Sequence, residues 1–438
     1  MTSRLRPAWI MALIALAGCG PSGTIRFAHD PTLNSEDFAA KPRLRAKVIE
    51  ETNRLFGESP QHLRVPAGAG LQEGGRYLGN LTQETVDGEE DGALSLVVYM
   101  DHQGREVPIA GGQALYRRHC MHCHGVTGDG DGPTAPFLYP RPRDYRRGMF
   151  KFTMTNSGKP TRDDLRRTVL QGLHGTSMPA FEALMTRQEI EQVIDYVIFL
   201  SMRGEFQYQL ADIATGLDES EENIAYLEEE SEPLASQIFD FWRRAQAPES
   251  IANPHGPRVA ATQDSIHRGR ELFLGTSKDV KLVCAGCHGA RGRGDGPSWV
   301  DKEAFDRFVF GGDPSPERIR ALGEYAGTEK GWSDDWGDPL RPADLNKGVY
   351  KGGRRPIDIY WRIATGISGT PMPGHTSALS ENPDDIWHLV NFVLALPYDR
   401  ELLQGVDASS VEAAPVANQP TATETEPEIS DHSMTALP

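Results

Sequence analysis

The pentapeptides Cys120-Met121-His122-Cys123-His124 and Cys284-Ala285-Gly286-Cys287-His288 decide how this chain folds. Both follow the pattern Cys-x-x-Cys-His, which is typical of c-type haem attachment. The spacing has a chemical reason, because two thiols must reach the two vinyl groups of one porphyrin while the adjacent imidazole reaches the iron. Four of the five cysteines of the chain lie in these two motifs. The sequence therefore predicts two covalently bound haem c groups.

The expected cofactor ligands follow directly from the two motifs. The thioether bonds are assigned to Cys120, Cys123, Cys284 and Cys287, and the proximal iron ligands to His124 and His288. The alternative is a zinc site, which would need a second ligand pair at each motif or a cage shared by both. A zinc half-site does not require His directly after the second Cys. Because haem carries redox chemistry, two haems imply movement of electrons.

The two motifs lie in two similar stretches of sequence. An Asp-Gly-Pro tripeptide follows at 131–133 and at 295–297, and an Arg-Pro-x-Asp tetrapeptide at 141–144 and 341–344. Further on, segment 172–179 aligns with segment 366–373, and both end in Met-Pro. We interpret the two stretches as an internal duplication.

Helical patterns occupy the same places in both stretches. They precede the motifs at 112–119 and 265–273, and they precede the Met-Pro segments at 163–171 and 357–365. Thr186 and Glu189 predict a capping box at the start of the next helix, and Asp384 is a candidate cap in the second stretch. This order of elements resembles the class I cytochrome c family. The resemblance implies a mainly α fold, with tandem cytochrome c domains at 106–204 and 263–402.

The same resemblance implies a Met ligand opposite each proximal His, which raises the potential of the haem. Met178 and Met372, each before Pro, occupy the equivalent positions. His174 and His375 lie near enough to be rival ligands. In the first stretch the other candidates for a Met ligand are Met149, Met154, Met185 and Met202.

Two arginines of the Arg-Pro-x-Asp segments, Arg141 and Arg341, are candidates for contacts with haem propionates, because a guanidinium fits a carboxylate well. The alternative is that both are ordinary surface arginines.

The N-terminus predicts a lipid anchor. Arg4 and Arg6 precede a short apolar stretch at 9–16, which is of signal-peptide length and too short to cross a bilayer. Residues 16–19 then read Leu-Ala-Gly-Cys and resemble the lipobox of bacterial lipoproteins, which implies removal of residues 1–18 and acylation of Cys19. An ordinary signal peptide with a chance Cys is the alternative. We expect the protein to be held on a membrane of the cell envelope, facing the periplasm or the exterior.

The rest of the chain carries no chemical motif. The extension at 19–105 is expected to hold a helix at 46–56 and a strand at 93–100. The linker at 205–262 is expected to be helical, with Pro233 as a break or a helix start. The insertion at 298–340 has no counterpart in the first stretch. The tail at 403–438 has the composition of a disordered segment.

Charge narrows the possible partners. The chain of 438 residues has 62 acidic and 45 basic residues, for a formal net charge of −17. Such a protein is a poor binder of nucleic acid, and its field favours basic patches on a partner protein. The alternative is that the acidic residues, many of them at 218–232 and in the C-terminal tail, form a solvated helix face and tail.

The function expected from these features is transfer of electrons between respiratory-chain partners by a membrane-anchored dihaem cytochrome, as a carrier or as a subunit of a respiratory complex. The alternative is a dihaem enzyme such as a cytochrome c peroxidase. Such an enzyme needs one iron with an open position, whereas both stretches offer a Met. We therefore expect an electron-transfer protein rather than an enzyme.

Overall fold

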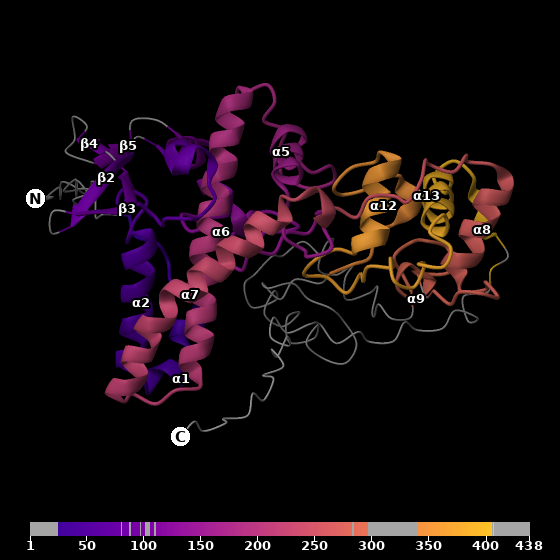
Figure 1. The fold of residues 1–438 in the computed structure, drawn as a ribbon. Helices are drawn as coiled ribbons and strands as arrows, with labels where there is room; N and C mark the ends of the chain where they lie inside the picture. The colour runs from indigo at the N-terminus through magenta and orange to yellow at the C-terminus, as the bar shows by residue number, and fades with distance from the viewer. Residues whose placement is uncertain are drawn as a thin grey trace, which may run out of the picture.

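The structure, a computed structural model, describes residues 25–79, 81–86, 89–96, 98–100, 106–108, 111–282, 284–296, 340–404 and 406. Cys19, residues 298–339 of the insertion and nearly all of the tail lie outside the described residues. Within them the fold is mainly helical, as predicted (Figure 1). The buried side chains form two hydrophobic clusters. No helix in the described ranges is long and apolar enough to cross a membrane.

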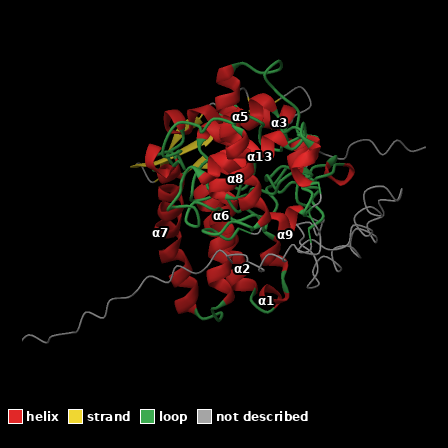
Figure 2. Cartoon of the chain, turned by 90° about the vertical axis from the view of Figure 1, so that its right-hand side faces the viewer, coloured by secondary structure: helices red, strands yellow, loops and turns green. Residues whose placement is uncertain are grey.

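The N-terminal extension combines two helices with two small antiparallel sheets, whose strands are confined to one part of the molecule (Figure 2). One sheet has the strand order β1-β3-β2 and the other pairs β4 with β5. The predicted helix at 46–56 is confirmed as part of a longer helix, and the predicted strand at 93–100 divides into β3 and β4. The elements are α1 (Glu36–Ala39), α2 (Pro42–Phe56), β1 (Arg64–Val65), β2 (Leu81–Val86), β3 (Glu89–Leu96), β4 (Val98–Met100) and β5 (Glu106–Pro108).

The first cysteine motif lies in a unit of four helices, α3 (Gly112–His119), α4 (Met121–His124), α5 (Arg162–Gln171) and α6 (Arg187–Thr215). The predicted capping box of Thr186 and Glu189 starts α6, and Thr161 and Asp164 form a second one that starts α5. Such boxes satisfy backbone donors that have no partner within the helix. Helix α6 continues beyond the end of the unit as far as Thr215.

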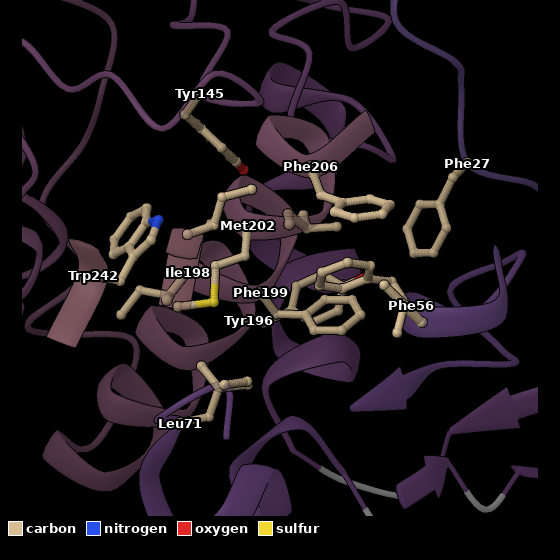
Figure 3. Close-up of a cluster of buried hydrophobic side chains, with 14 of the residues drawn as sticks. Phe27, Phe56, Leu71, Tyr145, Tyr196, Ile198, Phe199, Met202, Phe206 and Trp242 are labelled. Atoms are coloured by element: carbon tan, nitrogen blue, oxygen red, sulfur yellow. The ribbon is translucent and has the colours of Figure 1, made fainter. Parts of the chain in front are cut away.

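Long helix α6 holds the first unit and the N-terminal extension together. It packs against α2, α3, α5 and α7. Aromatic side chains fill the space between α6 and α2, where the ring centroids of Phe56 and Phe199 are 5.9 Å apart and those of Phe56 and Phe206 are 5.6 Å apart (Figure 3). The extension and the first unit therefore share one core.

After the end of α6, the linker forms one α-helix, α7 (Glu221–Ala245), which runs through Pro233. The prediction of a break or a helix start at Pro233 is therefore wrong. A proline inside a helix costs about 3 kcal/mol, because it removes a hydrogen bond and crowds the preceding turn. The buried stripe of Leu227, Leu234, Ile238 and Trp242 offsets that cost by packing against α2 and α6.

The second unit repeats the plan of the first with α8 (Gln263–Leu274), α9 (Cys284–His288), α12 (Pro356–Thr365) and α13 (Asp385–Ala395). Its first and last helices cross closely, as α3 and α6 do in the first unit. A Cβ on Gly269 would lie 2.1 Å from the carbonyl oxygen of His388, and one on Gly112 would lie 2.0 Å from that of Gln192. A glycine thus permits the same helix crossing in both units.

The two units meet through α5 and α12, which occupy equivalent positions in the repeat (Figure 1). Arg167 of α5 joins two buried carboxylates, with Nη2 2.8 Å from Asp164 of its own helix and Nη1 2.9 Å from Asp358 of α12. Its guanidinium also lies 5.2 Å from the ring centroid of Trp361. Asp164 is the counterpart of Asp358, and Arg167 is that of Trp361. The contact is therefore made by equivalent faces of the two units.

Candidate functional site

Each cysteine motif forms a single helical turn. In the first unit the amides of Cys123 and His124 donate to the carbonyl of Cys120, at 3.1 and 2.9 Å. In the second unit, α9 runs from Cys284 to His288. A turn of helix presents the two thiols and the imidazole from one short stretch of backbone. This is the arrangement that attachment of one porphyrin requires.

The glycine-rich loop after each motif packs directly on that turn. A Cβ on Gly132 would lie 2.4 Å from the carbonyl oxygen of His122, and one on Gly296 would lie 2.2 Å from that of Gly286. Real Cβ atoms do not approach so closely. The Asp-Gly-Pro repeat therefore reflects a close backbone approach that holds the cysteine turn in place.

The proximal histidines are presented in their neutral form. His288 Nδ1 lies 3.1 Å from the carbonyl oxygen of Ala343, so Nδ1 carries the proton and Nε2 is left to bind a metal. Burial lowers the pKa of His288, and this carbonyl opposes the shift. In the first unit burial lowers the pKa of His124 to about 4, and its Nδ1 is buried with no hydrogen-bond partner among the described residues. Neutral imidazole is the metal-binding form of histidine.

The loops that carry Met178 and Met372 are closed by the same hydrogen bonds. The amide of Leu173 donates to the carbonyl of Met178 at 3.1 Å, and the amide of Met178 donates to the hydroxyl of Thr176 at 3.1 Å. The two corresponding bonds of the second loop measure 3.1 and 3.3 Å. Both methionines are partly buried. The two loops thus offer a thioether in matching surroundings.

The rival ligands differ in their surroundings. Met154, Met185 and Met202 are buried, and the last two belong to the first hydrophobic cluster, which gives them packing roles. His174 is exposed, whereas His375 is partly buried and burial lowers its pKa. The assignment of Met178 and Met372 as axial ligands stays a prediction.

Arg341 holds the glycine-rich loop of the second unit. Its Nε and Nη2 donate to the carbonyls of Gly294 and Arg293, at 3.3 and 3.2 Å. Arg141 is partly buried in the equivalent segment. Contacts of Arg141 and Arg341 with haem propionates stay predictions.

Two tyrosines beside the first motif form a buried pair. Tyr145 donates to the hydroxyl of Tyr116 at 2.6 Å, and Tyr116 donates to the carbonyl of Gly125 at 2.9 Å. The ring of Tyr145 lies 5.6 Å from that of His124. Nothing in the sequence pointed to Tyr116, which belongs to α3.

Sequence reasoning also missed the residues by which each unit contacts the other. Arg362 of α12 is buried and donates to the carbonyl of Thr153 at 3.1 Å, with its guanidinium 5.1 Å from the ring centroid of Phe152. The Met loops take part as well, because Gly175 lies against Val349. A comparison of the two repeats could have pointed to Arg362, since Thr168 stands at its position in the first repeat.

Comparisons with known proteins agree with the repeat. Residues 107–197 match the family described as cytochrome c oxidase, cbb3-type, subunit III, and residues 266–397 match the family cytochrome c. No curated protein matches the chain. Among solved structures, the chain is similar to one in the reducing HAO-like protein complex of Kuenenia stuttgartiensis, with 26% identity over 65% of this chain and 94% of that chain, and a TM-score of 0.43.

The donor set fits haem c in both units: two thiols on one helical turn, a neutral imidazole and a thioether on a closed loop. Cytochrome c domains imply binding of haem c, and the cysteines at 120, 123, 284 and 287 stand where such binding needs them. When bound, haem supplies one-electron redox chemistry.

Proposed function

From the premise that the chain contains two cytochrome c family domains, we propose that it is a lipid-anchored dihaem cytochrome that passes electrons between respiratory-chain partners, either as a carrier or as a subunit of a complex. The observation that carries this proposal is the duplication of the whole donor set. Each unit has its own cysteine turn, its own buried proximal His and its own closed Met loop.

The equivalence of the two Met loops favours electron transfer over catalysis at an iron. Met178 and Met372 have matching hydrogen bonds through Thr176 and Thr370. An open coordination position on one iron would require the Met loop of that unit to differ from the other. The two loops do not differ in these hydrogen bonds. Met178 and Met372 would each hold one iron, and two irons held in this way would exchange electrons without binding a substrate.

The protein part contributes rigidity and a fixed placement of the two units. Close glycine contacts hold the cysteine turns, and backbone hydrogen bonds close the Met loops. Buried contacts made by Arg167 and Arg362 hold the two units against each other. Electron transfer between two centres depends on such a fixed distance.

The proposed location rests on the N-terminal sequence. Acylation of Cys19 would tether the chain to a membrane surface, and multiple acyl chains give stable anchoring. The net charge of −17 favours partners that present basic surfaces.

The haem content tests the proposal directly. We expect the mature protein, produced in a host that attaches haem c, to carry two haems per chain. The double variant C120A/C123A and its matched control C284A/C287A should each retain one haem. A single haem in the parent protein would contradict the proposal.

The anchor is tested separately. The parent protein is expected in the membrane fraction, and C19A should be released as a soluble protein with both haems. Equal distribution of C19A and the parent protein would refute the anchoring by Cys19 while leaving the redox proposal intact.

A further inference from the structure

Equivalent glycines of the two Met loops each contact the other unit, and these two junctions differ in charge. At the first, a Cβ on Gly175 would lie 3.1 Å from Val349 Cγ1. At the second, a Cβ on Gly369, the counterpart of Gly175, would lie 2.1 Å from Nη2 and 2.9 Å from Cζ of Arg143. The guanidinium thus occupies the place that a side chain at 369 would take. One junction is apolar, and the other holds a cation.

Arg143 reaches from the first unit into the second. In the repeat it is the counterpart of Ala343, whose carbonyl oxygen lies 3.1 Å from His288 Nδ1. Its side chain crosses to the other unit and lies at Gly369, three residues before Met372 in the same closed loop. Nη2 is shielded from solvent, and Nε lies 3.5 Å from the carbonyl oxygen of Met149. The cation is therefore held in place at the second Met loop.

The second repeat has no such charge, because Ala343 stands at the position of Arg143. A guanidinium is permanently charged, and its interaction with a second charge strengthens where water is excluded. A fixed positive charge beside a redox centre stabilises the state with one electron more. The asymmetry of the two junctions therefore gives the two sites unequal affinities for an electron.

We infer that Arg143 of the first unit acts on the haem site of the second, with its charged side chain raising the electron affinity of the haem bound there. This inference rests on the proposed dihaem function. Transfer of one electron from the first haem to the second forms and breaks no bond, and Arg143 makes that direction more favourable.

The test is a spectroelectrochemical titration of the two haems in the full chain. R143A gives residue 143 the side chain of its counterpart Ala343, R143K keeps the charge, and R243A removes an equal charge from an exposed site on α7. We expect R143A to lower the electron affinity of one haem at least threefold, or by about 28 mV at 59 mV per tenfold for one electron. R143K and R243A should stay close to the parent protein.

The affected haem is identified in an M178H background. His in place of Met lowers the potential of the first haem, because Met ligation raises it, so the second haem titrates at the higher potential. The inference requires the potential of the second haem, the higher of the two, to fall when R143A is combined with M178H.

Several results would overturn the inference. It would be rejected if R143A left both potentials unchanged or if the potential fell as far in R143K as in R143A. A shift confined to the first haem would reject it as well. If R143A does not fold, R143Q removes the charge at similar length and is judged by the same criterion. If two haems titrate in the parent protein and R143A has no effect on their potentials, the proposed function stands and only the role of Arg143 is rejected.

Discussion

The salt bridge between Arg167 and Asp358 offers the sharpest test of how the two units dock. The two side chains are 17% and 2% exposed, and their atoms Nη1 and Oδ1 lie 2.9 Å apart. At that distance the Coulomb energy is about 6 kcal/mol for an effective dielectric constant of about 20. Desolvation of both charges offsets much of it. We expect a coupling free energy of about 1–3 kcal/mol, which is above the 0.2–1 kcal/mol of exposed pairs.

A double-mutant cycle isolates this energy. R167A, D358N and the double variant are compared with the parent protein by urea unfolding of the haem-loaded chain. The single variants also lose the bonds of Arg167 to Asp164 and of Asp358 to Arg355, and the cycle removes these from the coupling free energy. The cycle for Arg54 and Glu232, an exposed pair, is the control. A coupling below about 0.5 kcal/mol for Arg167 and Asp358 would refute docking through α5 and α12.

Three further outcomes are expected. G269A should lower the free energy of unfolding by about 2 kcal/mol or more, because its Cβ would lie 2.1 Å from the carbonyl oxygen of His388. The control G216A, whose Cβ would have only one atom within 4 Å, should be nearly neutral in the same urea titration. Burial, with help from nearby arginines, lowers the pKa of His29. Its contribution to stability is therefore complete above its unfolded pKa of about 6.5 and is lost as the pH falls below that value. Between pH 7.5 and pH 5 the free energy of unfolding should fall less in H29Q than in the parent protein, and an equal fall would contradict this expectation. M372A should let carbon monoxide bind about half of the reduced haem, and an unchanged spectrum would argue against Met372 as a ligand.

Local signals in the sequence predicted most of the helices. The helix expected at 112–119 coincides with α3, and the capping box of Thr186 and Glu189 starts α6. These features depend on residues close in sequence, so their pattern is legible without the fold. The two cysteine motifs are equally local, since each is a single turn of helix.

Features that depend on residues far apart in the chain could not be predicted from the sequence. Pro233 predicted a helix break, but packing against α2 and α6 stabilises α7 as one helix across this residue. The contact between Arg167 and Asp358 joins residues far apart in the chain. Nothing near Arg143 reveals that its guanidinium reaches Gly369, because that depends on how the units dock.

The absorption spectrum of the dithionite-reduced protein, before and after carbon monoxide, tests the central claim most directly. If Met178 and Met372 hold the sixth positions of two haems, carbon monoxide should leave the spectrum unchanged. A shift in about half of the haem would mean that one iron is open, and it would contradict an electron-transfer role for both units.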